Sequence, residues 1–541
     1  MSEADNSVAK AVEAAVAREP DRSALVFLGQ RYSYRRLWRD ASALAGAMAT
    51  REIAPGDRVM IYAPHCPQWV IAWLAAQRLG AVAVPVTHFY GAEDLRAIAC
   101  DSGAVAILCA DTGFGQLDRV LSRTPLRLVM VTSLVDLLPA WKRLLGHALD
   151  RVPTGRTRAG KGIVPLRRLL AEGAAPPEPA PAAGALCEML FTGGTTGRPK
   201  GVPISHGLWL TACREQRRAS LAAVPEGAQV VLQGAALYHI LGQVVGLGAL
   251  LFGETVLLLP RGNQDALLDH VARYRATTLI GTPTFFRSLL EHDRISQYEL
   301  SSLRFCFSGG DVLPAETAAR WQRLTGRPLL QGYGATETCG GVALCAADDP
   351  APPGAAGRIC AHQRVRVVDP ETLAPLPPGE GGELLVSSDQ MVREYWNQPE
   401  ETAKAFIELE GRRWYRTGDV VRVDADGWMF FLDRSVDLIK HKGWRVAASR
   451  VDRALQEHPA VIASCTVGVP DPEAGERIKS FVVARSDVAG VNAAELIRWC
   501  KDRLAPYEVP QYVEFRDMLP KSKVGKTLRR ELRDEERRKR G

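Results

Sequence analysis

The sequence predicts an α/β protein with a large N-terminal part and a smaller C-terminal part. Segments with helical periodicity alternate with short β-branched strands, as in residues 232–242, 254–260 and 277–283, and this alternation is typical of βαβ units. From about residue 357 the pattern changes to short strands separated by Pro/Gly turns. The chain has 541 residues, of which 46% are hydrophobic and 24% are charged. This length is too great for a single hydrophobic core, so we expect two or more globular domains.

We expect neither a secretory leader nor a membrane span in the N-terminal region. Its first twenty residues carry acids and no long apolar run, unlike a secretory signal. The most apolar run, residues 69–86, is broken by Arg78 and Gly80 and is too short to cross a bilayer. The eleven cysteines include no CxxC pair, which argues against a disulfide framework and a zinc site. We therefore expect a cytoplasmic protein.

The charge excess is small and dispersed. A net charge of +7 results from 68 cations and 61 anions, without the dense basic stripe usual in nucleic-acid binding. The exception is the segment from Lys142 to Arg168, which holds eight Lys/Arg residues and one acid, Asp150. Either a solvated loop or a contact with anionic membrane would account for this segment. We expect no nucleic-acid partner.

Residues 190–202 read LFTGGTTGRPKGV. Glycine lets backbone N–H groups approach an anion, threonine hydroxyls add donors and Lys200 adds charge, so the stretch is suited to binding polyphosphate. It is not a Walker loop, because Pro199 stands where that pattern needs glycine. A Gly/Thr hairpin with no ligand is the alternative.

Residues 357–432 predict a β-rich subdomain of short strands and Pro/Gly turns. After WMFFLDR, residues 428–434, the sequence becomes charged and begins a region with strand and helix patterns of its own. We therefore place the domain boundary between Asp433 and Arg434, which divides the chain into domains 1–433 and 434–541.

Four stretches follow one another along the chain: FTGGTTGRPKGV (191–202), QGYGATE (331–337), WYRTGD (414–419) and LPKSKVGKTLRREL (519–532). In order and separation they resemble the signatures of the adenylate-forming superfamily, which includes acyl-CoA synthetases, firefly luciferase and the adenylation domains of peptide synthetases. The resemblance implies two layered α/β subdomains and a small β-barrel-like subdomain in the N-terminal domain, followed by a small mobile α+β domain.

The resemblance also implies a nucleotide site. It assigns the β- and γ-phosphates of ATP to Thr192, Gly194, Thr195, Thr196, Gly197 and Lys200. Thr336 would donate to the α-phosphate, and Glu337 would hold Mg²⁺, a hard ion that prefers oxygen ligands. The adenine would lie between Tyr333 with Gly334 and the SGGDV segment with Gly309, Gly310 and Asp311. Asp419 would accept from both ribose hydroxyls, Arg434 would touch the ribose, and Arg445 would meet the phosphates.

The resemblance makes Lys526 the catalytic residue of adenylation. An ammonium placed at the α-phosphate stabilises negative charge as it develops, an effect worth on the order of 3 kcal/mol for one preorganised donor. The alternative is a solvated basic tail. In the superfamily the C-terminal domain swings between a pose that inserts this lysine and a pose that admits the thiol.

This chain departs from the superfamily pattern near the predicted boundary. Asp433 stands in place of glycine, Val436 in place of a polar hinge residue, and Arg450 in place of a common glutamate. A β-branched residue is stiff and disfavours positive φ, so we expect the thiol-transfer step to be affected more than adenylation.

The acyl site is predicted near His239, where the superfamily has an aromatic-histidine element lining the acyl and thiol channel; a hydrogen-bonded core histidine is the alternative. Small residues at 337–341 and the segment GTPTFF (281–286) indicate an apolar pocket, which disfavours amino acid substrates. Residues 142–168 resemble the basic insert of bacterial long-chain fatty acyl-CoA synthetases. Peripheral contact with the inner face of the membrane and a solvated loop both stay open for this segment.

Together these resemblances predict an AMP-forming acyl-CoA synthetase. It would use ATP, Mg²⁺ and CoA to convert a medium- or long-chain fatty acid, through acyl-AMP, into acyl-CoA. The alternatives are a CoA ligase for an aromatic or alicyclic acid, an acyl-AMP ligase that loads a separate carrier protein, and a non-catalytic acyl or nucleotide sensor. A homodimer is a further expectation, and the acyl chain length stays open.

Overall fold

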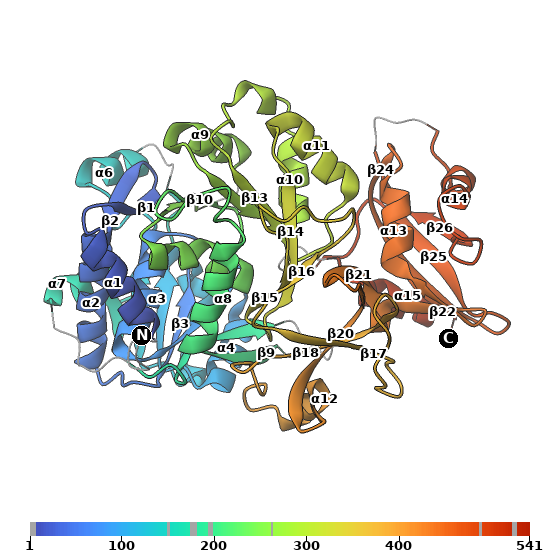
Figure 1. The fold of residues 1–541 in the computed structure, drawn as a ribbon. Helices are drawn as coiled ribbons and strands as arrows, with labels where there is room; N and C mark the ends of the chain where they lie inside the picture. The colour runs from blue at the N-terminus through green and yellow to red at the C-terminus, as the bar shows by residue number, and fades with distance from the viewer. Residues whose placement is uncertain are drawn as a thin grey trace. The chain divides into compact units, whose positions relative to one another are not determined.

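The computed structural model describes residues 7–148, 152–173, 181–192, 199–260, 263–485, 490–521 and 527–540. The chain divides into two compact units. Unit 1 is Met1–Pro352, Ala356–Arg364 and Ser387–Tyr415, and unit 2 is Pro353–Ala355, Val365–Val386 and Arg416–Gly541. Helices and strands are mixed in both units (Figure 1), so the predicted α/β class is confirmed.

The first sheet of unit 1 has the strand order β7-β6-β5-β3-β4-β8-β9. These strands are β3 (Arg58–Tyr62), β4 (Val82–Pro85), β5 (Ala106–Ala110), β6 (Leu128–Thr132), β7 (Ile163–Pro165), β8 (Leu186–Thr192) and β9 (Lys200–Ser205). Only the β8–β9 pair is antiparallel among the described pairs of this sheet. The helices that accompany it are α2 (Tyr34–Ala49), α3 (Pro67–Leu79), α4 (Ala92–Ser102), α5 (Asp111–Asp118), α6 (Ala140–Ala148) and α7 (Leu166–Glu172).

The apolar run at residues 69–86 forms most of α3 together with β4. Nearly every residue of α3 is buried, as expected for a helix that is apolar all round and lies inside a core. Its Trp73 packs against Trp209 of α8 (His206–Arg218), with ring centroids 5.1 Å apart. Among the described residues, no helix is both long and apolar enough to span a membrane.

The second sheet of unit 1 runs β16-β15-β14-β13-β12-β10-β11-β1-β2. Its strands are β1 (Ser23–Phe27), β2 (Gln30–Ser33), β10 (Val230–Gln233), β11 (Thr255–Leu258), β12 (Thr278–Gly281), β13 (Phe305–Gly309), β14 (Leu329–Ala335), β15 (Gly340–Leu344) and β16 (Gly357–Ile359). From β1 to β14 along this order the pairs are parallel. The helices are α1 (Val8–Arg18), α8, α9 (Gln264–Tyr274), α10 (Pro283–Leu290) and α11 (Ala315–Thr325).

Two of the three segments used to predict the fold have the expected structure. Residues 254–260 and 277–283 contain β11 and β12. The helix predicted over residues 232–242 is wrong, because β10 extends to Gln233 and a turn follows. Continuous helical backbone lies further along, in η3 (Gly242–Gly246) and η4 (Leu247–Phe252).

The β-rich segment lies mostly in unit 2 and contains β17 (Arg364–Val368), β18 (Gly381–Ser387), β20 (Arg412–Val423) and β21 (Trp428–Arg434). The strand order is β17-β18-β20-β21. A barrel requires its last strand to return to its first, whereas in the described residues β17 ends the order. The prediction of a barrel-like subdomain is therefore wrong, and these strands belong to an open sheet. In unit 1, α12 (Pro399–Ala405) precedes β19 (Phe406–Leu409), which pairs with the start of β20.

The remainder of unit 2 is the predicted α+β arrangement. Its sheet runs β23-β22-β25-β24, with β26 beside β25. The strands are β22 (Leu438–His441), β23 (Trp444–Ala447), β24 (Val461–Asp471), β25 (Gly475–Ala484) and β26 (Tyr512–Phe515), and the helices are α13 (Ala448–Gln456), α14 (Ala493–Lys501) and α15 (Arg529–Arg540). Residues Ile439, Val451, Leu455 and Leu496 form part of its core. The domain boundary at 433/434 stays a prediction.

Candidate nucleotide and acyl site

The glycine-rich stretch connects the antiparallel strands β8 and β9. Thr192 ends β8 and lies opposite Lys200, which begins β9. The stretch therefore spans a hairpin at one end of the first sheet, with the predicted phosphate ligands Thr192 and Lys200 on its two strands. Gly194, Thr195, Thr196 and Gly197 lie outside the described residues, so their roles stay predictions.

Lys200 is held by residues about 200 positions away in sequence. Its Nζ lies 2.6 Å from Oε2 of Glu401 and 4.7 Å from the ring centroid of Tyr395. Hydrogen bonds from Lys200 and Lys404 lower the pKa of Glu401 to about 2. The Nε2 of Gln398 also donates to the carbonyl of Pro199, at 3.2 Å. The segment before and within α12 thus fixes the start of β9.

Glu337 lies in the turn between β14 and β15 and is 9% exposed. The Tyr395 hydroxyl donates to Oε1 of Glu337, with the two oxygens 2.8 Å apart. Burial raises the pKa of Tyr395, and the Glu337 carboxylate raises it further, so this tyrosine keeps its proton and remains a donor. Tyr395 therefore touches both the predicted phosphate ligand Lys200 and the predicted metal ligand Glu337.

The residues around Glu337 fit a Mg²⁺ ion. One carboxylate oxygen is oriented by Tyr395, and no hydrogen bond to the other is seen among the described residues. Carboxylate oxygen is the ligand type that Mg²⁺ prefers. Thr338 closes the turn, because its Oγ1 accepts from Ala335 N at 3.0 Å and donates to Gly340 O at 2.7 Å. Thr336, in the same turn, is partly exposed.

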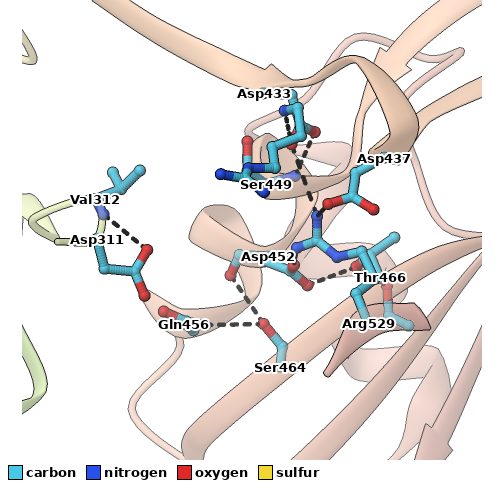
Figure 2. Close-up of polar contacts among 12 residues, drawn as sticks. Asp311, Val312, Asp433, Asp437, Ser449, Asp452, Gln456, Ser464, Thr466 and Arg529 are labelled. Atoms are coloured by element: carbon cyan, nitrogen blue, oxygen red, sulfur yellow. Dashed lines mark hydrogen bonds and ion pairs between the residues drawn. The ribbon is translucent and has the colours of Figure 1, made fainter. Parts of the chain in front are cut away.

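The two segments predicted to enclose adenine lie on neighbouring parallel strands. Ser308 and Gly309 at the end of β13 are in register with Gln331 and Gly332 of β14, so the carboxyl ends of these strands meet at one edge of the sheet. Such edges are the usual ligand sites of open α/β sheets. This register places Gly309, Gly310 and Asp311 next to the strand that carries Tyr333 and Gly334. The carboxylate of Asp311 accepts from Val312 N at 2.8 Å (Figure 2).

Gly334 is required by the close approach of β15. A Cβ atom at this position would lie 2.1 Å from the carbonyl oxygen of Gly340. A β-bulge between Tyr333 and Gly334 shifts the register here, and bulges often redirect side chains beside functional sites.

In unit 2, the two residues predicted to bind ribose are brought together. Asp419 of β20 lies directly opposite Arg434 of β21, and Arg434 Nε is 3.1 Å from Asp419 Oδ1. Asp419 is buried, whereas the Arg434 side chain is 56% exposed. The pairing neutralises the buried carboxylate.

The two remaining predicted cations are only partly covered by the structure. Lys526 lies outside the described residues. Its neighbours form a bridge between Lys521 and Thr527, and Leu528 N donates to Pro520 O at 2.8 Å. Arg445 is on β23 opposite Lys440, but its side chain is not described. Their roles stay predictions.

His239 follows β10 and is exposed, so it is not the core histidine of the alternative interpretation. Its ring packs 5.0 Å from that of Tyr238, which in turn lies 6.3 Å from the ring of His88. His65 accepts from Leu237 N at 3.1 Å. Burial lowers the pKa of His65 to about 4 and lowers that of His88. His65 and His88 are therefore uncharged at neutral pH.

The sequence analysis did not identify Tyr395, Glu401, His65 or His88 as site residues. The histidines follow β3 and β4, so their place after predicted strands could have indicated them. Tyr395 and Glu401 belong to the segment EYWNQPEET, and nothing in its pattern links it to Lys200 or Glu337. Only the folded chain brings these residues together.

Comparison with known proteins identifies the family of this chain. The AMP-binding enzyme family matches residues 12–396, and the AMP-binding enzyme C-terminal domain matches residues 450–526. A long-chain-fatty-acid–CoA ligase of Bacillus subtilis (strain 168) is 31% identical over 530 residues, which cover 96% of this chain and 93% of the relative. A feruloyl-CoA synthase of Amycolatopsis sp is 34% identical over 517 residues, covering 95% and 96%.

Among solved structures, ATP-bound MatB from Rhodopseudomonas palustris superposes with a TM-score of 0.83. The two sequences are 26% identical, and the superposition covers 97% of this chain and 98% of MatB. Enzymes of this kind use ATP, Mg²⁺ and CoA. The chain therefore belongs to the AMP-binding enzyme family, as an AMP-forming acid–CoA ligase.

Proposed function

We propose that this enzyme activates a medium- or long-chain fatty acid and transfers the acyl group to CoA. The observation that carries the proposal is the convergence of Lys200 and Glu337 on Tyr395. It joins the phosphate loop to the carboxylate suited to Mg²⁺, as nucleotidyl transfer requires. The choice of a fatty acid rests on the relatives named long-chain-fatty-acid–CoA ligase.

In this mechanism the acid carboxylate attacks the α-phosphorus of ATP, pyrophosphate leaves, and the CoA thiol then attacks the acyl-adenylate. Lys200, positioned by Glu401, holds the leaving phosphates. Thr336 donates to the α-phosphate, and Asp419 accepts from the ribose hydroxyls. Lys526 stabilises the charge that develops during the first step. Mg²⁺, when bound at Glu337, neutralises phosphate charge.

The acyl chain enters beside the aromatic and histidine cluster that follows β3, β4 and β10. Neutral His65 and His88 add no fixed charge there, which suits an apolar acid better than an amino acid. A second candidate is an aromatic acid, which the feruloyl-CoA synthase relative favours. Loading of a separate carrier protein and formation of a homodimer also stay predictions.

We further propose that the enzyme works in the cytoplasm and collects its substrate at the anionic inner face of the membrane through residues 142–168. Helix α6 exposes Trp141, Leu144 and Leu145, whose side chains are 63%, 72% and 52% exposed. Their i, i+3, i+4 spacing places them on one helix face. Exposed aromatic and aliphatic side chains among cations favour an anionic lipid surface.

The test is carboxylate-dependent release of AMP and pyrophosphate across fatty, aromatic and alicyclic acids, with and without CoA. We expect C8 to C18 fatty acids to drive CoA-dependent AMP formation, and Lys526→Ala to abolish acyl-AMP formation while ATP binding persists. A preference for aromatic acids would select the second candidate. Adenylation that CoA never accelerates would favour the carrier-loading alternative.

A further inference from the structure

Asp433 is the last residue before the predicted domain boundary, and it replaces a glycine of the superfamily pattern. It lies on β21 and is 2% exposed. A buried carboxylate is stable only when its oxygens accept hydrogen bonds or meet cations. The partners of Asp433 therefore show what the substitution adds to the molecule.

Those partners lie beyond the boundary. Oδ2 of Asp433 accepts from Ser449 N at 3.0 Å (Figure 2). The hydroxyl of Ser449 donates in turn to the carbonyl of Leu432 at 2.7 Å. Ser449 is the second residue of α13, and the N-cap residue before this helix, Ala447, has no side chain that could accept a hydrogen bond. Asp433 thus supplies, from β21, the acceptor that a helix N-terminus requires.

The same carboxylate faces the guanidinium of Arg529, at the start of α15. Arg529 Nη1 lies 3.7 Å from Asp433 Oδ1 and 3.4 Å from Asp437 Oδ2, and its Nη2 lies 2.6 Å from Asp452 Oδ2 (Figure 2). Asp452 also accepts from Thr466 Oγ1 at 2.7 Å. Of these three aspartates, only Asp433 precedes the boundary. The others connect parts of residues 434–541 to each other.

A cavity of about 560 Å³ lies beside this junction, lined before the boundary by Val420, Phe431 and Leu432 and after it by Ala447, Arg450 and Ala454. Residues on both sides of the boundary therefore line this cavity, and the polar contacts of Asp433 join the two sides next to it.

We infer that Asp433 is a positioning residue that latches residues 434–541 to β21 by capping α13 and pairing with Arg529. The inference rests on the proposed function, in which this region must swing between two poses. Leaving the observed pose uncaps α13 and separates a buried carboxylate from its cation. Glycine at this position could make neither contact, so the latch is a property of this chain's own residue.

The test compares Asp433→Gly and Asp433→Asn with the wild-type full-length enzyme. Two single-turnover rates are measured: acyl-AMP formation without CoA, and thioester formation when CoA is added to preformed acyl-AMP. We expect the ratio of these rates to change roughly fivefold in Asp433→Gly, the effect of losing one helix cap. Asp433→Asn retains an acceptor for Ser449 N and should give a smaller change.

Asp452→Asn is the matched control. It removes the nearest carboxylate from Arg529 but no contact to β21, so its rate ratio should change less than that of Asp433→Gly. An equal shift in Asp452→Asn and Asp433→Gly would reduce Asp433 to a general stabiliser and overturn the latch. An unchanged ratio in both Asp433 variants would overturn it as well.

Two measurements need no substrate. Amide hydrogen exchange should rise in the first turn of α13, and the small-angle scattering profile should change, in Asp433→Gly but not in Asp452→Asn. If no acid is activated and these changes are still seen, the latch stands and the proposed function fails. If acids are activated but exchange and scattering match wild type, the latch fails alone.

Discussion

At the scale of single residues, Tyr395 contacts the two charged side chains, Lys200 and Glu337, that we predict to serve nucleotide binding. Its ring lies against the Lys200 ammonium, and its hydroxyl binds the Glu337 carboxylate. A hydrogen bond to an ionised group fixes the direction of that group as well as its charge. Glu337 is therefore presented in one orientation before any ligand arrives.

Tyr395→Phe keeps the ring but removes the hydroxyl. We expect kcat/KM for adenylation to fall roughly tenfold, the cost of a hydrogen bond to a charged group, and half-maximal activity to need more Mg²⁺. Pyrophosphate exchange across a Mg²⁺ series measures both quantities. Tyr298→Phe removes a hydroxyl that donates to Asp265 at 2.7 Å and should leave both unchanged. Wild-type Mg²⁺ dependence in Tyr395→Phe would refute this role.

Glu188 is a buried carboxyl group that accepts a hydrogen bond from an uncharged side chain, the indole of Trp73. Trp73 Nε1 donates to its Oε2 at 3.3 Å, and burial raises the pKa of Glu188 to about 8. The folded state therefore holds a proton that the unfolded state releases near pH 4.5. It follows that stability from this group is present below the unfolded pKa and is lost as the pH rises toward 8.

Glu188→Gln removes this titration and keeps an acceptor for Trp73. Between pH 5.5 and 8, the free energy of unfolding of wild type should fall relative to the variant by up to about 1.4 kcal/mol per pH unit. Denaturant unfolding at both pH values measures the difference, with Glu13→Gln on the exposed face of α1 as the control. Parallel pH profiles for wild type and Glu188→Gln would contradict the assignment.

At the scale of elements, the turn from β14 to β15 depends on close backbone contact. Gly334 and Gly341 are cross-strand partners, and the ATE motif follows within this turn. The strand ends here because Thr338 bonds back to Ala335, which places Glu337 next to Tyr395. The position of Glu337, the predicted metal ligand, is thus set by a two-strand contact that admits no side chain.

Gly334→Ala should disrupt this contact, since its Cβ would meet the Gly340 carbonyl. We expect a loss of about 1–3 kcal/mol in stability, typical of overpacking, and a higher KM for ATP. Thermal unfolding and initial rates measure these effects. Gly184→Ala is the control, because a Cβ there meets nothing within 4 Å. Normal stability and KM in Gly334→Ala would show that the strands can separate without cost.

At the scale of the whole molecule, each unit has its own hydrophobic core, and unit 1 also has a helix outside that core. Unit 1 carries the exposed helix α6 with its apolar face of Trp141, Leu144 and Leu145. Lys142 of this helix donates to Leu28 O at 3.1 Å, which ties α6 to the turn after β1. The helix is therefore anchored to the unit while its apolar face stays exposed.

Replacing Trp141, Leu144 and Leu145 by serine should reduce binding to anionic vesicles roughly tenfold or more, because three large apolar side chains no longer leave water. Flotation with phosphatidylglycerol vesicles measures the bound fraction. Leu221→Ser, at a leucine that is 39% exposed, is the control. Equal flotation of the triple variant and wild type would show that this face of α6 makes no contact with the membrane.

The sequence by itself determined the α/β class, the order of the motifs and, through them, the family. These properties depend on periodicity and on short stretches, so they are readable along the chain. The apolar run at 69–86 forms most of α3 together with β4, and its length and polar interruptions are likewise local properties that can be read from the sequence.

Only the tertiary structure decided that the β-rich strands form an open sheet, that Glu401 holds Lys200, and that Asp433 caps α13. Strand order and ion pairing join residues whose separation in sequence has no fixed relation to their distance in space. The substitution at Asp433 was visible in the sequence, but its partner Ser449 was not. The effect of a carboxylate depends on its hydrogen-bond and ion-pair partners, and the tertiary structure determines which residues those are.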